Sequence, residues 1–274
     1  MSVLFEACVS QVKRLQRLSK TCELLANHSD TALLKVRKNG MYIDITDSES
    51  FCAVECRIPE RTFQYVRLAV DQGWQAKIHM DQLAFELKKL ARSKQTVVFL
   101  STDDEPLILK LKTRDAVIPI ASTEHRLRKF YPLQVSKFFD GHDYLHIRLS
   151  NAELNRIVNH QCVASGLHGG VASIRVVTDP LVVTFALMGD CGAAVEFDIH
   201  PAASDVVHAP KTALRCTYFL TYWKRAQTMF AIHHEFTHVY VANHGVFLVQ
   251  EFIDQPSVFV CVADVSNVDL KSYV

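Results

Sequence analysis

The chain has 274 residues, of which 49% are hydrophobic and only 9 are Gly and 8 are Pro. This composition excludes an intrinsically disordered chain and allows one large domain or two of ordinary size. The formal net charge of +1 gives no sign of a nucleic-acid partner at the level of the whole chain. No apolar run approaches the roughly 18 residues that span a bilayer. Lys13 and Arg14 follow the apolar start instead of preceding it, the wrong order for a signal peptide. We expect a soluble intracellular protein with no membrane partner.

The first part of the chain predicts a strand, a helix and three further strands. Leu15, Leu18 and Cys22 recur at helical spacing, and Asn39-Gly40 is a dipeptide typical of hairpin turns. In chain order, the expected elements are a strand at residues 2–9, a helix at 11–26 and strands at 32–36, 41–45 and 51–58.

The same order of elements then restarts three times. The second unit has a strand at 74–79, a helix at 82–92 and strands at 96–101 and 107–112. The third has a strand at 144–149, a helix at 152–164 and strands at 172–177, 182–187 and 193–199. The fourth has a strand at 212–216, a helix at 218–227 and strands at 231–241, 246–252 and 258–263. Repetition of this kind marks a repeated supersecondary unit.

One such unit cannot cover both faces of its helix, so two units must pack side by side. The sequence therefore predicts an α+β fold of two similar domains, each made of two strand-helix-strand units. We expect an N-terminal domain at residues 1–118, a connector at 119–140 and a C-terminal domain at 141–274. The connector contains Pro119, Pro132 and a basic cluster.

Basic residues concentrate on the predicted helices. The stretches 11–26, 82–94, 150–164 and 217–228 carry 11 basic and 3 acidic residues, a net of +8, which leaves −7 for the rest of the chain. Any one amphipathic helix exposes charge, but the same sign excess on three helices favours a shared anionic partner. Lys and Arg on helices without interleaved aromatic residues suit phosphate contact, which is independent of base sequence and weakens with salt. The candidate residues are Lys13, Arg17, Lys20, Lys88, Lys89, Arg92, Lys224 and, as a lesser candidate, Arg156.

A competing motif lies near the C-terminus. His234, Glu235 and His238 match HExxH, which on a helix places two histidines on one zinc ion and a Glu beside the attacking water. The flanking residues favour a strand, in which the two histidines would lie about 13 Å apart, too far for one metal. A zinc hydrolase is the alternative from another function class.

The eight cysteines include no CxxC pair. The closest two, Cys52 and Cys56, would lie about 13 Å apart on one strand, too far to share a zinc ion. We expect all eight to be reduced thiols in the core.

Short matches give the pattern a family resemblance. Phe5-Glu6-Ala7, Asn39-Gly40 leading to Asp47-Ser48, and Ala213-Leu214-Arg215 resemble proliferating cell nuclear antigen, the replicative DNA sliding clamp. The stretches AVIPI at 116–120 and GVFLVQEF at 245–252 look more like subunits of the DNA-damage checkpoint clamp. The resemblance spans essentially the whole chain.

This resemblance implies a nuclear, non-catalytic protein without a cofactor. Two domains per subunit and three subunits would close a ring, with the helices lining its hole and the sheets outside. The expected partners are double-stranded DNA without sequence specificity, two further clamp subunits, a clamp loader, and repair and checkpoint proteins.

The resemblance also carries over site residues. It assigns Arg215 to the DNA-facing set together with the basic residues named above. The connector, where clients of such rings dock, would present Ile118, Ile120, Arg126, Leu127, Arg128 and Lys129.

Two departures separate this chain from the replicative clamp. Its connector is basic where the replicative clamp's is acidic, and the acidic close of that clamp's last strand is absent. We therefore favour a subunit of the heterotrimeric checkpoint clamp, with a homotrimeric replicative clamp, a polymerase processivity factor, as the alternative.

Overall fold

The computed structural model describes residues 2–46, 52–69, 73–122, 133–164, 170–188, 194–223, 236–250 and 256–264. The chain divides into two compact units. Unit 1 comprises Met1–Thr46, Glu55–Phe130 and Glu251–Val258, and unit 2 comprises Asp47–Val54, Tyr131–Gln250 and Phe259–Val274. The predicted domain limits, 1–118, 119–140 and 141–274, stay a prediction. None of the described helices is long and apolar enough to cross a membrane.

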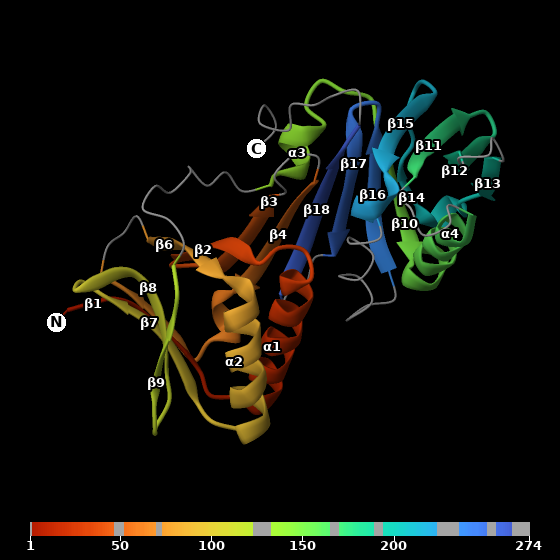
Figure 1. Ribbon diagram of the computed structural model, residues 1–274. Coiled ribbons are helices and arrows are strands. Elements are labelled where there is room, and N and C mark those ends of the chain that lie inside the picture. The colour runs from red at the N-terminus through yellow and green to blue at the C-terminus, as the bar shows by residue number, and fades with distance from the viewer. Residues whose placement is uncertain are drawn as a thin grey trace. The chain divides into compact units, whose positions relative to one another are not determined.

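Unit 1 contains two helices and antiparallel strands (Figure 1). The five-stranded sheet, which we call sheet A, has the strand order β5-β1-β7-β8-β9. Four strands of another sheet also belong to unit 1, in the order β4-β3-β2-β6. The elements are β1 (Val3–Val9), α1 (Val12–Ala26), β2 (Thr31–Arg37), β3 (Gly40–Thr46), β4 (Cys52–Pro59), η1 (Glu60–Thr62), β5 (Tyr65–Leu68), β6 (Trp74–His79), α2 (Met80–Ser93), β7 (Val97–Thr102), β8 (Glu105–Lys112) and β9 (Val117–Ile120).

The local sequence explains these elements. In α1, Leu15, Leu18 and Leu25 are almost fully buried, and the polar positions between them stay open to solvent. The predicted hairpin at Asn39-Gly40 joins β2 to β3. Gly40 has a φ of +138°, and a Cβ there would lie 2.2 Å from the Ile58 carbonyl oxygen, so only Gly fits the turn.

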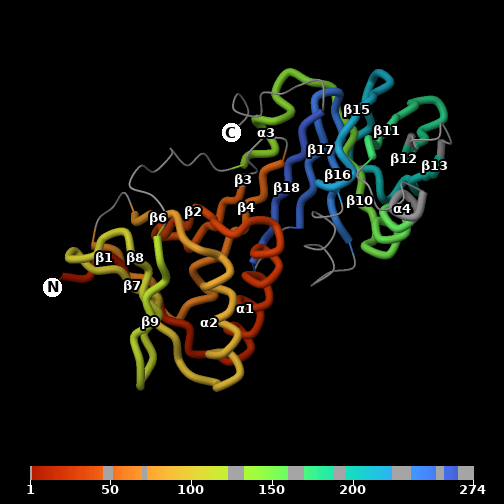
Figure 2. The backbone as a smooth tube through the Cα atoms, viewed as in Figure 1, coloured from red at the N-terminus to blue at the C-terminus, as the bar shows by residue number. Residues whose placement is uncertain are grey.

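Helices α1 and α2 pack side by side, as the trace of the backbone makes plain (Figure 2). The inward stripe of α2 buries Leu83, Leu87 and Leu90. Because both helices bury their apolar stripes, their polar stripes form one solvent-facing surface on unit 1.

Unit 2 contains a four-stranded sheet, sheet C, of order β13-β12-β11-β15, and strands in the order β14-β10-β16-β17-β18. The elements are α3 (Val135–Phe138), β10 (Leu145–Ser150), α4 (Asn151–Ala164), β11 (Val171–Thr178), β12 (Leu181–Met188), β13 (Ala194–Ile199), η2 (Ala203–Asp205), β14 (Val206–His208), β15 (Leu214–Phe219), β16 (Phe236–Ala242), β17 (Gly245–Gln250) and β18 (Ser257–Ala263).

An aromatic cluster in unit 2 anchors α3. Phe138 lies with its ring centroid 5.5 Å from that of Phe247, and Phe139 stacks on Tyr240 at 5.5 Å. A Cβ at Gly245 would lie 2.8 Å from the ring of Phe138, so the Gly permits this close approach. Part of the predicted connector is therefore regular structure packed into a core.

The predicted order of strand, helix and strands is found within the described residues, although β5, β9, α3 and β14 were not predicted. One predicted element is corrected. Tyr218 and Phe219 were expected to begin the fourth helix, but they end strand β15, and helical structure starts at residues 220–223. The buried positions Leu214, Cys216 and Tyr218 alternate, which is the strand period. The remainder of that predicted helix, to residue 227, lies outside the described residues.

Candidate nucleic-acid interface

The outer stripe of α1 is basic. Lys13, Arg17 and Lys20 are all exposed, on the side of the helix away from its buried leucines. Glu23, one turn beyond Lys20, is the one acidic residue of the helix.

The outer stripe of α2 continues this surface. Lys88, Lys89 and Arg92 are exposed. The Lys88 ammonium lies 3.2 Å from a Glu23 carboxylate oxygen and joins the two helices across their solvent-facing side. The Lys89 ammonium lies 3.3 Å from a Glu86 oxygen and 4.1 Å from the ring centroid of Phe85.

Together α1 and α2 carry seven basic and three acidic residues. Unit 1 thus brings six of the predicted contact residues onto one surface, which we call the basic face: Lys13, Arg17, Lys20, Lys88, Lys89 and Arg92. Exposed ammonium and guanidinium groups on flexible stems can meet phosphates without a fixed register.

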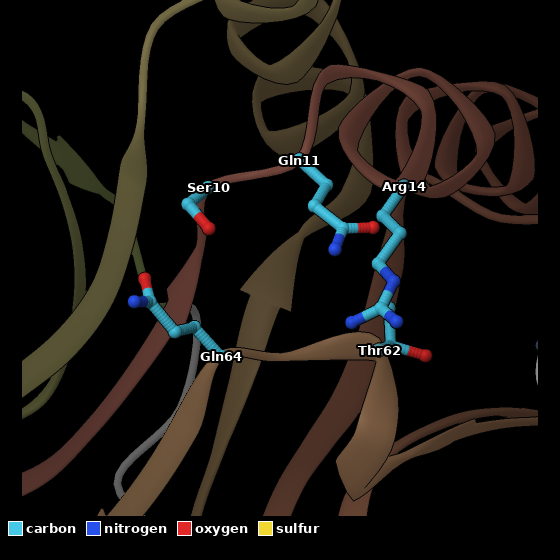
Figure 3. Close-up of a pocket in the computed structure, with 5 residues that line it drawn as sticks. All are labelled: Ser10, Gln11, Arg14, Thr62 and Gln64. Atoms are coloured by element: carbon cyan, nitrogen blue, oxygen red, sulfur yellow. The ribbon is translucent and has the colours of Figure 1, made fainter.

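A small polar pocket lies at the start of α1 (Figure 3). It has a volume of about 180 Å³ and is lined by Ser10, Gln11, Arg14, Thr62 and Gln64. The helix has no side-chain cap on its first amides and no acidic residue in its first turn. The dipole of α1 therefore adds positive electrostatic potential at the N-terminus of the helix, on the same helix as Lys13, Arg17 and Lys20 of the basic face. The sequence alone does not indicate that Arg14 lines a pocket, because Thr62 and Gln64, which line it as well, come about fifty positions later in the chain.

The predicted contact residues of unit 2 are arranged differently. Arg156 is exposed on α4, and its guanidinium carbon lies 4.6 Å from the ring centroid of Phe197. Lys224 lies outside the described residues.

Arg215 lies on a strand, and the register of sheet C gives its direction. Phe197 pairs with Phe185, Phe185 with Ile174, and Ile174 with Cys216, so all four share the face that Arg156 covers. Neighbouring strand residues point to opposite faces, so Arg215 points away from α4. There it lies opposite Arg175 of β11. The expectation that Arg215 joins the helix residues is corrected for this reason.

The predicted connector residues are only partly within the described chain. Ile118 is half-buried and Ile120 is fully buried in β9, so the side chain of Ile120 packs inside unit 1 instead of facing a partner. The remaining four, Arg126, Leu127, Arg128 and Lys129, lie outside the described residues.

His238 of the HExxH motif lies in strand β16, as predicted, while His234 and Glu235 lie outside the described residues. Its Nδ1 lies 2.9 Å from Nε2 of His146 on the neighbouring strand. Burial, together with His238 and His208, lowers the pKa of His146 to about 4. Within the described ranges no group of three or more His, Cys, Asp or Glu is placed to hold a metal ion.

The described cysteine side chains are buried thiols outside any disulfide bond, as predicted: Cys8, Cys22, Cys52, Cys56, Cys216 and Cys261. Burial raises the pKa of the Cys22 thiol to about 12, so this thiol stays protonated and unreactive. For the side chains of Cys162 and Cys191, which lie outside this set, the prediction stands untested.

The whole chain was compared with known proteins. It matches the crystal structure of PCNA from Thermococcus kodakaraensis with a TM-score of 0.70, over 95% of this chain and 99% of that chain, at 15% sequence identity. The chain has the sliding-clamp fold. No protein-family model and no curated protein matches it. The predicted α+β clamp fold is confirmed, and the match at this identity establishes the fold alone.

Proposed function

We propose that the chain is a subunit of a ring that encircles duplex DNA and acts as a binding platform without chemistry of its own. The basic face on a sliding-clamp fold is the observation that carries this proposal. In a closed ring, helices of this charge would line the hole and meet the phosphate backbone from within.

Phosphate contact of this kind permits movement along DNA. The backbone repeats the same charge at every step, so each Lys or Arg can exchange one phosphate for the next without loss. Such binding is independent of sequence and weakens steeply with salt. The ring itself would keep the protein on DNA, and the charges would only centre the duplex.

At the finer level we propose a nuclear checkpoint clamp. This ring would have three different subunits, would be loaded on damaged or primed DNA by a clamp loader, and would recruit repair and signalling proteins. The support is the resemblance at residues 116–120 and 245–252 and the basic sequence at Arg126, Arg128 and Lys129. A homotrimeric processivity factor is the alternative. Light scattering on the purified chain separates them, because a self-made trimer supports the alternative and a lone monomer supports a mixed ring.

Retention on circular DNA tests the ring. The chain, isolated with its associated subunits and loader, is placed on nicked circular duplex, and the DNA is then cut once. We expect retention on the circle and release on linearisation, because a ring slides off a free end. Equal retention on circular and linear DNA would contradict encirclement.

Charge reversal tests whether the basic face lines the hole of the ring. Replacing Lys88, Lys89 and Arg92 by Glu should leave the fold intact and abolish retention on the circle. The matched control replaces Lys38, Arg61 and Lys211 by Glu, three exposed basic residues outside α1, α2 and α4 that give the same change in charge. Equal losses in both triple variants would mean that net charge matters and the basic face does not.

A further inference from the structure

Phe85 is an aromatic residue in the middle of the outer stripe of α2. Its side chain is 57% exposed. The buried stripe of the helix includes Leu83, Leu87 and Leu90. Two residues along a helix correspond to a turn of about 200°, so Phe85 lies on the side opposite Leu87. The expectation of basic helices without interleaved aromatic residues is corrected at this position.

The neighbours of Phe85 on the outer stripe are mainly basic. Residues three and four positions apart are adjacent on a helix surface, and these positions after Phe85 hold Lys88 and Lys89. Arg92 follows on the same side one turn further along, and all three basic side chains are exposed. The acidic neighbour, Asp81, belongs to the first turn of α2, where a negative charge complements the helix dipole.

The exposed ring of Phe85 differs in its setting from the other large hydrophobic side chains that are exposed within the described ranges. Those other side chains all lie on strands: Val3, Val117, Val171, Val177, Val207 and Phe236. A protein partner that covered Phe85 with an apolar site would also have to desolvate the ammonium and guanidinium groups around it, which is costly. A nucleic-acid strand offers phosphates to these groups and a base to the ring.

The chemistry of the ring matches such a strand. The Lys89 ammonium lies 4.1 Å from the ring centroid, over one face of the ring. Aromatic rings set among basic residues bind single strands, because the bases stack on the rings while the phosphates contact the cations. In an intact duplex every base is already stacked between its neighbours, whereas an unpaired base has a face open to a new ring.

We propose that Phe85 is a base-stacking residue, through which the basic face binds an unpaired nucleobase next to duplex DNA. This inference rests on the DNA contact of the basic face proposed above. The ligand is a duplex with a gap or a single-stranded extension, and its base sequence matters little because every base has a face that can stack.

The test measures binding of the full-length chain to an intact duplex and to the same duplex with a gap of unpaired thymidines, by fluorescence anisotropy at one salt concentration. We expect the wild-type chain to bind the gapped probe more tightly. Phe85→Ala should bind the gapped probe at least about fivefold more weakly, because loss of one stacked base costs a factor of roughly 5 to 150. Its affinity for the intact duplex should not change. Equal wild-type affinity for both probes, or an unchanged preference in Phe85→Ala, would overturn the proposal.

Phe236→Ala is the matched control. Phe236 is 42% exposed and has the Arg148 guanidinium carbon 4.8 Å from its ring centroid, but it lies on β16 of unit 2, outside the basic face. Both affinities should stay at the wild-type values in this variant. Phe85→Tyr keeps a ring and should keep the preference for the gapped probe, whereas Phe85→Leu should lose most of it. Equal losses in the two alanine variants would overturn the assignment to Phe85.

Photochemical crosslinking locates the base. A 5-iodouracil placed in the gap joins, on irradiation, to an aromatic ring stacked on it, and mass spectrometry of the digested product identifies the residue. We expect the crosslink at Phe85 in the wild-type chain and its loss in Phe85→Leu. A crosslink that forms only at other residues would overturn the stacking.

Failure of the DNA contact looks different from failure of the stacking. If the basic face did not bind DNA, reversing the charges of Lys88, Lys89 and Arg92 would leave the affinity for the intact duplex unchanged. If only the stacking were wrong, this reversal would still weaken duplex binding, while Phe85→Ala would retain the wild-type preference.

Discussion

The helix pair of unit 1 and helix α4 of unit 2 occur in similar strand-helix-strand settings but carry different charge. Helices α1 and α2 present seven basic residues, six of them on one exposed face. The only Lys, Arg, Asp or Glu residues of helix α4 are Arg156 and Glu153. Arg156 rests on Phe197, and Glu153 accepts from the Ser150 hydroxyl at 2.8 Å in a capping arrangement. Both charges of α4 therefore serve local structure. In α1 and α2 the ion pairs of Lys88 with Glu23 and of Lys89 with Glu86 involve only two of the six basic-face residues.

The largest expected effect comes from reversing the charge of α1. Replacing Lys13, Arg17 and Lys20 by Glu should weaken duplex binding by about 100-fold or more, since three phosphate contacts become repulsions. The slope of log K against log salt should fall by about 3, close to 0.9 for each contact. Fluorescence anisotropy on a labelled duplex across a salt series measures both quantities.

The matched change in unit 2 is Arg156→Glu. We expect a loss of less than about threefold, within the range of one exposed contact. If this single change weakened binding as much as the triple change in α1, the difference between the two units would have no bearing on DNA contact.

The sequence predicted the elements of both units because apolar periodicity is strong in them, as at Leu15, Leu18 and Cys22 in α1. It misplaced Tyr218 because the buried alternation of β15 runs directly into the first helical residues. It did not find β5, β9 or β14, each of four residues or fewer, in which too few positions alternate to give a signal.

For the candidate site, helical spacing was enough to find the basic face, because charge on one stripe of a helix follows from the sequence alone. Arg215 was carried over by resemblance, and its direction depends on a pairing register between strands distant in the chain.

The two units should also respond to pH in opposite directions. In unit 2 the pKa of His146 is lowered to about 4, mainly by burial, against roughly 6.5 in an unfolded chain. Between these values the unfolded chain binds the extra proton, so unit 2 loses stability as pH falls from 6.5 to 4. We expect a loss of about 1–2 kcal/mol after allowance for partial exposure. His146→Gln should abolish it.

In unit 1 burial, and then the neighbouring Glu55, raise the pKa of Asp44 to about 7. Here the folded form holds the proton that the unfolded chain has released, so unit 1 loses stability as pH rises from about 4 to 7. Asp44→Asn should remove this dependence.

The chain has two tryptophans, Trp74 in unit 1 and Trp223 in unit 2, both buried. Because each unit contains one of these two tryptophans, the pH dependence of stability can be measured separately for unit 1 and unit 2. Urea unfolding of Trp223→Phe reports unit 1 by fluorescence, and unfolding of Trp74→Phe reports unit 2. Stability that moves in the same direction with pH for both reporters would contradict the assigned pKa directions.

The smallest expected effect concerns Glu23, the acidic residue within the basic face. Its ion pair with Lys88 joins side chains that are 46% and 37% exposed, so Glu23→Gln should change the free energy of unfolding by less than about 0.5 kcal/mol. The same change removes a negative charge beside Lys88 and should strengthen duplex binding by about two- to threefold.

Glu153→Gln in α4 is the matched control. It should leave DNA affinity unchanged and weaken the start of its helix, because the carboxylate there completes a cap. Tighter binding in both variants would mean that the gain comes from net charge, and that the basic face of unit 1 is not where the duplex lies.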